Sequence, residues 1–250
     1  STIRNRMTKL NGGTPISDGP FRNGSMYLTY TNEGMPIGAF WGYKTDGLIQ
    51  TQEQLNAVKR ADFQPNAELG DVLFVDTNGD GKLDSSDRCM IGNPIPDIIY
   101  GINMGMAWKG FDLNLQFGGT IGNQIFNAMR YYTYFPNDIT NKDRALMNYW
   151  TPNNTNTDIP RLTATDVNDN DRFSDMYVEN GTYFRLRNAQ LGYTLPASLT
   201  QRIKLQKVRF YVSGQNLFTI SSYSGMDPEV GQSSSLSRGI DYGIYPQNIS

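Results

Sequence analysis

The clearest hydrophobic pattern in the sequence is a strict alternation on either side of the dipeptide Lys109–Gly110. Apolar or aromatic side chains occupy every second position: Tyr100, Ile102, Met104, Met106, Trp108, then Phe111, Leu113, Leu115 and Phe117. A period of two is typical of β-strands, because successive side chains point to opposite faces. The pattern predicts two antiparallel strands that share one apolar face and are joined by a tight turn. Three polar residues are then expected on the opposite face: Asn103, Asn114 and Gln116.

A second pair of strands is predicted at 182–195 and 207–220. In the first, one face carries Ala189, Leu191 and Tyr193, and the other carries Asn188, Gln190 and Gly192. In the second, Val208, Phe210 and Val212 lie opposite Arg209, Tyr211, Ser213 and Gln215. Arg185 and Arg187 interrupt the apolar face near the start of its strand, so we expect them beyond any hydrocarbon layer. The connection 196–206 is short and could hold one helical turn.

The lengths of the connections favour a membrane β-barrel. Long polar segments, 49–97 and 119–181, surround the first pair, with a short helix predicted at 141–150. The loops around Asp76, Thr151 and Ser233 fall at one end of the strands, and the two short connections fall at the other. Outer-membrane barrels have short turns at one end and long extracellular loops at the other, whereas compact soluble domains rarely contain such loops. A soluble hairpin packed on a core remains the alternative.

Composition removes several classes of function. The formal net charge is −2, which gives no electrostatic basis for binding nucleic acid. There is no histidine, so in-chain Ser-His-Asp or Cys-His catalysis and His-based zinc sites are excluded. The single cysteine, Cys89, cannot form an intrachain disulfide. The 12% aromatic content, 25 glycines and mean hydropathy of −0.51 fit an all-β protein with large loops.

The segment DTNGDGKLDSSD, residues 76–87, has the spacing of an EF-hand or dockerin-like calcium loop. The predicted ligands are Asp76, Asn78, Asp80, the backbone carbonyl of Lys82, Asp84 and Asp87. Gly81 stands sixth, where the loop must turn sharply. The preceding segment GDVLFVD is predicted to be a strand and not the first helix of an EF-hand pair, so a sensor or buffer site is not expected. We expect a structural Ca²⁺ that orders a loop without a hydrophobic core of its own. A polar surface turn is the alternative, since Asp, Asn and Gly also favour turns.

Six segments together resemble the C-terminal part of the SusC/RagA family of TonB-dependent outer-membrane transporters from Bacteroidetes. They follow the family order and cover nearly the whole chain: GMPIGAFWGYKTDGLIQ, GDVLFVDTNGDGKLDSSDRCMIGNPIPDIIYGINM, YWTPNNTNTDIPRL, YVENGTYFRLRNAQLGYTLP, VRFYVSGQNLFTISSYSGMDPEV and GIDYGIYPQ. The set is far more specific than the calcium loop alone.

The resemblance implies that residues 1–250 are antiparallel strands of a transmembrane barrel of about 22 strands, with residues 76–87 in an extracellular loop. It implies a non-enzymatic outer-membrane transporter that imports glycan or peptide fragments. The implied partners are a SusD-like surface lipoprotein as lid, TonB acting through a missing N-terminal region, and outer-membrane lipid. The family's plug, earlier strands and closing strand have no counterpart in this sequence, so we expect a fragment.

Two other classes of function follow from the residues. A soluble calcium-braced β-sandwich could display its aromatic side chains to a carbohydrate. A glycosidase would need a pair of carboxylates, and the chain has 24 acidic residues. Most of these residues fall in predicted loops, where acidic side chains are ordinary hydrated surface groups. An enzyme is therefore not expected.

Overall fold

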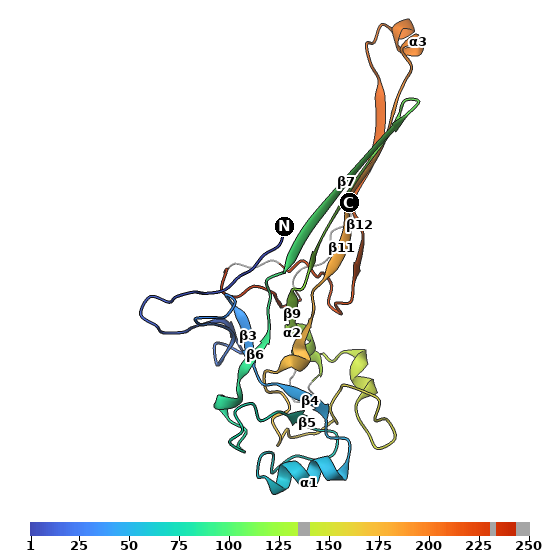
Figure 1. The fold of residues 1–250 in the computed structure, drawn as a ribbon. Helices are drawn as coiled ribbons and strands as arrows, with labels where there is room; N and C mark the ends of the chain where they lie inside the picture. The colour runs from blue at the N-terminus through green and yellow to red at the C-terminus, as the bar shows by residue number, and fades with distance from the viewer. Residues whose placement is uncertain (135–140, 231–233, 244–250) are drawn as a thin grey trace.

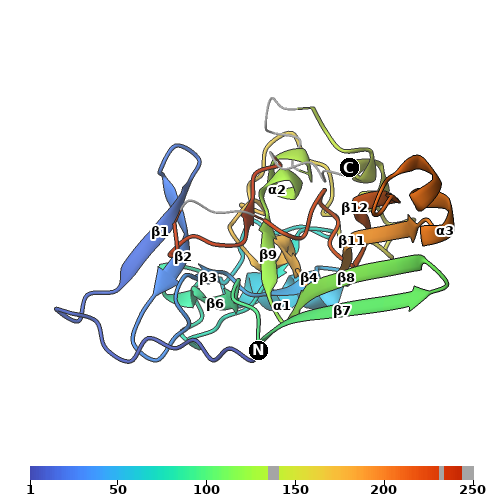
Figure 2. The same cartoon turned by 90° about the horizontal axis from the view of Figure 1, so that it is seen from above.

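The computed structural model describes residues 1–134, 141–230 and 234–243. Figure 1 shows two parts: a long, narrow sheet and, at one end of it, a body built from the remaining segments. Figure 2 views the same arrangement from above, with the hairpin of the first two strands projecting from the body. Ser233, around which a loop was predicted, and the residues after Gly243 lie outside the described residues.

The long sheet, called the wall below, contains the four predicted strands. They are β7 (Ile98–Trp108), β8 (Phe111–Ile121), β11 (Tyr183–Thr194) and β12 (Arg209–Ser221), all antiparallel in the order β12-β11-β8-β7. Lys109 and Gly110 form the turn between β7 and β8 with φ of 48° and 90°. Positive φ at both central residues is the geometry of two-residue hairpins, and glycine adopts it without strain. The sequence prediction of these strands is confirmed.

The short connection between β11 and β12 contains the helix α3 (Ala197–Thr200) and the 3₁₀ turn η4 (Gln201–Ile203). It lies at the same end of the wall as the Lys109–Gly110 turn, and the body lies at the other end (Figure 1). The short and the long connections therefore lie at opposite ends of the wall, as the sequence predicted. The described strands do not close into a barrel, and nothing in them fixes the number of strands in a complete one.

The body contains short strands and helices instead of unstructured loops. Its strands are β1 (Ile16–Phe21), β2 (Met26–Thr31), β3 (Ala39–Gly42), β4 (Thr45–Leu48), β5 (Val72–Phe74), β6 (Cys89–Gly92), β9 (Gln124–Asn127), β10 (Val178–Asn180) and β13 (Ile240–Asp241). They form the sheets β1-β2-β3-β6, β10-β9-β13 and β4-β5. Its helices and 3₁₀ turns are α1 (Gln52–Arg60), α2 (Ala128–Tyr134), η1 (Ser85–Asp87), η2 (Arg144–Asn148) and η3 (Asp175–Tyr177).

The helix α1 was missed by sequence reasoning, although its start carries a clear signal. Thr51 Oγ1 accepts a hydrogen bond from the backbone N–H of Gln54 at 3.2 Å, and Gln54 Oε1 accepts one from the Thr51 N–H at 3.0 Å. This reciprocal capping box satisfies two of the N–H groups that a helix start leaves unpaired. The helix η2 lies within the segment where a short helix was predicted. None of the described helices is long and apolar enough to span a membrane.

The body has hydrophobic cores of its own, so the expectation that these segments are coreless loops is wrong. The largest core is mainly aromatic and combines distant parts of the sequence: Phe21, Leu28, Phe40, Phe126, Ala128, Tyr131, Phe173, Tyr177 and Ile240. Phe126 meets Phe173 edge to face, with ring centroids 4.9 Å apart. Edge-to-face packing of this kind adds to the stabilisation from burial. Two smaller cores lie around β5 and α1.

Candidate functional site

One face of the wall is apolar across all four strands. Residues paired across an antiparallel sheet share a face, and the register aligns Met104 with Leu115 and Ala189, and Met106 with Leu113 and Leu191. These side chains lack a covering layer in the structure: Met106 is 67% exposed and Val212, aligned with Leu191, is also 67% exposed. An exposed apolar surface of this extent marks a contact with a partner or a membrane.

Aromatic side chains form a row at each end of this apolar face. At the end with the short connections the row is Trp108, Phe111, Tyr193 and Phe210, which are successive cross-strand partners. At the end with the body it is Tyr100, Phe117, Phe184 and Phe218, with the Phe117 and Phe184 rings stacked at 5.2 Å.

The spacing of the rows matches a bilayer. Tyr100 and Trp108 lie at opposite ends of β7, roughly 27 Å apart at about 3.4 Å per residue. At the strand tilt of ~40° found in membrane barrels, this gives a height of about 20 Å, close to the ~25 Å apolar band of such barrels. The side chains between the two rows are Ile, Leu, Met, Ala and Val.

A β-bulge corrects the expected placement of Arg185 and Arg187. The register shifts between Leu186 and Asn188, so β11 contains one more residue there than β8, and β12 contains one more than β11. A one-residue shift moves every following side chain to the other face. Phe184 and Leu186 consequently join the apolar face, with Leu186 opposite Phe117, and Arg185 lies on the polar face. The arginines do not interrupt the apolar face, contrary to the prediction.

The opposite face of the wall is polar. Asn103, Asn114 and Gln116 lie on it, as the alternation predicted, and Asn103 is aligned with Gln116. Arg209 on β12 reaches across β11 to Asp112 on β8, with Nη2 and Oδ2 2.6 Å apart. The strand between them has Gly192 at this place, where a Cβ would collide with both side chains.

A charge cluster centred on the buried Arg185 connects this polar face to the segment after β12. Arg185 is 4% exposed and pairs with Asp227 and with Glu229, the latter at 3.0 Å. Arg187 also pairs with Glu229, at 3.1 Å. The acidic partners come from a stretch that reads as loop, so this cluster could not be predicted from the sequence pattern. Its geometry fixes this segment onto the polar face of the wall.

Gly119 is expected to be the least replaceable glycine of the wall. The Tyr100 hydroxyl crosses it to donate a hydrogen bond to the Tyr183 carbonyl at 3.0 Å, and a Cβ would collide with that backbone oxygen. Gly119→Ala should destabilise the folded protein by about 1–3 kcal/mol, as overpacking does. Denaturant titration of the refolded protein in detergent measures the change. Gly105→Ala is the control, because the nearest neighbour of a Cβ added there is the Asn114 side chain at 3.4 Å. Equal losses of stability in the two variants would contradict the prediction that Gly119 is the less replaceable glycine.

The predicted calcium loop follows β5 directly and is held by hydrogen bonds within itself. Asp76 accepts from the N–H groups of Gly79 and Gly81 at 2.7 and 2.8 Å. These two donors, Gly81 foremost, hold the pKa of the Asp76 carboxyl below its usual range. Gly81 has φ of +78°, which is the sharp turn that the motif requires.

Asp87, the last predicted ligand, stabilises the loop through hydrogen bonds to its backbone. Asp87 is fully buried, and its two carboxylate oxygens accept from the N–H groups of Thr77 and Asp84 at 3.0 and 2.9 Å. Leu83 packs against the core around β5 and attaches the loop to the body. Within the described part of the chain, no three acidic, histidine or cysteine side chains converge as a metal site. The six predicted ligands all lie in this one loop, and its calcium stays a prediction.

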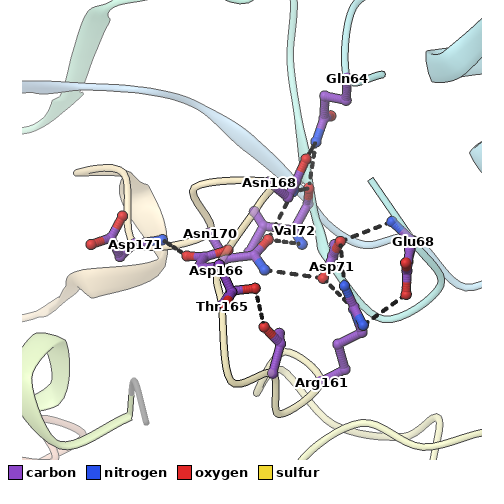
Figure 3. Close-up of polar contacts among 11 residues, drawn as sticks. Gln64, Glu68, Asp71, Val72, Arg161, Thr165, Asp166, Asn168, Asn170 and Asp171 are labelled. Atoms are coloured by element: carbon purple, nitrogen blue, oxygen red, sulfur yellow. Dashed lines mark hydrogen bonds and ion pairs between the residues drawn. The ribbon is translucent and has the colours of Figure 1, made fainter. Parts of the chain in front are cut away.

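A buried polar network, absent from the sequence-based predictions, attaches the segment 161–171 to β5 (Figure 3). Asp71 is completely buried; its Oδ1 accepts from Arg161 Nε at 2.6 Å and from Asn170 Nδ2 at 3.0 Å. Arg161 also pairs with the exposed Glu68 at 2.8 Å. A buried carboxylate needs such a set of donors to offset its lost hydration.

Side-chain amides in this network act as a substitute for a neighbouring strand. Asn170 Oδ1 accepts from the Val72 N–H at 2.8 Å, and Gln64 Nε2 donates to the Val72 carbonyl at 2.9 Å. Gln64 Oε1 accepts from the Phe74 N–H at 3.0 Å. Since β5 pairs only with β4 in the described sheet, these amides satisfy its second edge.

Two cavities lie beside Arg130, the arginine of α2. One, of about 440 Å³, has Gln50, Gln54 and Thr157 in its wall, and the other is about 510 Å³. Arg130 pairs with Asp158 and stacks over the Tyr134 ring at 4.9 Å. Both cavities are within the size range of small-ligand sites.

Comparison with known proteins gives relatives over nearly the whole chain. No protein-family model matches. The TonB-dependent receptor P3 of Formosa agariphila is 37% identical over 258 residues, covering 98% of this chain and 25% of the receptor. The TonB-dependent receptor SusC of Bacteroides thetaiotaomicron is 30% identical over 189 residues, covering 75% of this chain and 18% of SusC. The chain thus spans about a quarter or less of these relatives.

Solved structures agree with the sequence matches. The RagAB peptide importer in its open-open state superposes with a TM-score of 0.69 at 25% identity, covering 98% of this chain and 24% of the matched chain. The RagAB peptide transporter gives a TM-score of 0.65 at 24% identity, which supports the fold. All these relatives are receptors or importers and none is an enzyme, as predicted. The 250 residues are thus similar over most of their length to TonB-dependent receptors, including SusC, and to RagAB in fold, consistent with a fragment of the SusC/RagA family.

Proposed function

We propose that these residues supply wall strands and part of the extracellular region of an outer-membrane transporter that imports glycan or peptide fragments. The observation that carries this is the wall itself, with an exposed apolar face bounded by two aromatic rows and a polar face behind it. In a membrane barrel the apolar face contacts lipid and the polar face lines the lumen. A soluble β-sandwich would leave this apolar face in water, which counts against the alternative.

The edges of the wall support the same proposal. Among the described residues β7 and β12 are its outer strands, and Thr2 already bridges Ile98 at the start of the free β7 edge. Unpaired backbone groups are not tolerated in lipid, so both edges need neighbouring strands from the rest of the receptor.

Fractionation of the native source tests the proposal. The protein that carries this sequence should sediment with outer membranes, require detergent for extraction, and run as a heat-modifiable species much larger than 28.1 kDa. A water-soluble species near that mass would contradict it.

We propose in addition that the body, at the extracellular end, meets a SusD-like surface lipoprotein and that its cavities beside Arg130 contact the imported fragment. TonB would act through a region outside these residues.

Peptide is the cargo named for the RagAB neighbours, and glycan fragments are the other class to test. Co-purification with a lipoprotein and uptake assays with both classes distinguish these roles; Arg130→Gln should reduce uptake, with the exposed Arg60→Gln as control.

We also propose that the loop 76–87 binds Ca²⁺ through Asp76, Asn78, Asp80, Asp84, Asp87 and the Lys82 carbonyl. Binding requires the acidic side chains to exchange backbone N–H donors for the ion. The expected affinity is weak, on the order of 10⁻⁴–10⁻³ M, as in extracellular modules. Backbone N–H groups hold the pKa values of Asp76 and Asp84 below the usual carboxyl range, so both side chains are charged and can bind a cation at neutral pH.

Luminescence of Tb³⁺ added to the purified receptor, with displacement by Ca²⁺, measures this binding. The double variant Asp80→Asn/Asp84→Asn should abolish the loop's saturable signal, and the exposed Glu53→Gln in α1 should leave it unchanged. A saturable signal that survives the double variant would place the ion elsewhere, and the absence of any signal would leave the loop as a hydrogen-bonded turn.

A further inference from the structure

The end of the wall that carries the short connections has a cluster of positive charge. Its exposed cations are Lys109, Arg202, Lys204 and Lys207. Over the described residues none of the four forms an ion pair. The stretch 194–211 contains no acidic residue, and the carboxylate of Asp112 is already paired with Arg209. The formal charge of the whole chain is nevertheless −2, so positive charge is concentrated here.

Hydrogen bonds bring these cations together. The Thr194 N–H donates to the Gly110 carbonyl at 2.8 Å, which places the β7–β8 turn beside the end of β11. The Leu195 N–H donates to the Val208 carbonyl at 2.9 Å, which closes the base of the connection to β12. The turn and the connection therefore form one tip, visible beyond the strands in Figure 1.

Apolar side chains surround the cations at this tip. Trp108 is 69% exposed and Phe210 64%, and within the connection Leu199 and Leu205 are 50% and 48% exposed. The Lys109 ammonium lies 4.7 Å from the Trp108 ring centre. Aromatic rings and cations at one level are typical of the membrane interface, where rings sit among headgroups and cations reach phosphates.

We propose that this tip binds the anionic headgroup of a glycerophospholipid in the adjoining leaflet, with Arg202, Lys204 and Lys207 on the phosphate and Leu199 and Leu205 against the acyl chains. This rests on the proposed membrane location of the wall. A lipid is favoured over free phosphate because the exposed leucines would otherwise remain in water. Attraction to anionic lipid is about 1 kcal/mol per nearby cation, or about fivefold in affinity.

The test uses the complete receptor, purified in detergent and titrated with phosphatidylglycerol or phosphatidylcholine, with bound lipid counted by native mass spectrometry. We expect preferential retention of phosphatidylglycerol. The triple variant Arg202→Gln/Lys204→Gln/Lys207→Gln should lower that preference at least about tenfold. The matched control Lys9→Gln/Lys59→Gln/Arg60→Gln removes the same charge from exposed positions of the body and should retain it.

Each contrary result has a separate meaning. Equal retention of the two lipids, or a preference that survives the triple variant, overturns the lipid site and leaves the transporter proposal intact. Displacement of phosphatidylglycerol by millimolar inorganic phosphate would replace the lipid with a free anion and also overturns it. A receptor that needs no detergent would refute the membrane location on which both proposals rest.

Discussion

Replacing Leu115 with arginine is expected to prevent stable assembly of the wall in a membrane. Leu115 lies on β8 between the two aromatic rows, opposite Ala189 and opposite Met104, which is midway between Tyr100 and Trp108 on β7. A charged side chain at the midplane of a membrane barrel destabilises the folded state by about 2–4 kcal/mol. The folded fraction of the receptor in lipid vesicles, followed by heat-modifiable migration across a urea titration, measures this change.

Asn114→Arg provides the matched control, because it introduces the same side chain one residue earlier on the polar face. It should shift the urea midpoint by a fraction of the Leu115→Arg shift, since an arginine there remains hydrated. Equal shifts for the two variants would mean that the two faces of β8 have the same surroundings, and the wall could then not separate lipid from a lumen.

Replacing Asp71 with alanine is expected to have the largest effect in the body. The substitution leaves Arg161 and Asn170 without their buried acceptor, and the removal of one partner from a buried ion pair destabilises a protein by about 3–5 kcal/mol. The segment 161–171 should detach from β5 and become sensitive to proteases. Limited proteolysis of the folded receptor, with mapping of the cleavage sites, measures this.

Glu68→Ala is the control for this prediction, because Glu68 pairs with the same arginine but is exposed. Surface ion pairs contribute about 0–1 kcal/mol, so proteolysis should change little. Equal sensitivity in the two variants would show that burial of Asp71 adds nothing, and that the network in Figure 3 does not hold the body together.

The wall could be predicted from the sequence because its signal is local. Alternation of side chains along one strand fixes which face each residue occupies, and the two-residue turn fixes the register of β7 and β8. The bulge was missed, although a signal for it exists. The residues that β11 places on the apolar face are Phe184, Leu186, Ala189, Leu191 and Tyr193. The step of three between Leu186 and Ala189 marks the extra residue.

The body could not be predicted in the same way because its contacts are not local. Phe21, Phe126, Tyr131 and Phe173 meet in one core from segments up to about 150 residues apart, and no period in the sequence connects them. The Asp71 network has the same character, since its arginine and asparagines come from a polar stretch that reads as loop. The loop 76–87 was recognised by spacing, and its calcium stays a prediction.

The most direct test of the membrane wall is a nitroxide scan of β8 and β11 in the complete receptor reconstituted in lipid. With Cys89→Ser as background, single cysteines at successive positions are labelled, and collisions with oxygen in lipid are compared with collisions of a water-soluble nickel chelate. We predict lipid exposure at 113, 115 and 117 and at 184, 186, 189 and 191, with the alternation reversing at Arg187. Uniform exposure to water along both strands, or lipid exposure at 114 and 116, would contradict the account.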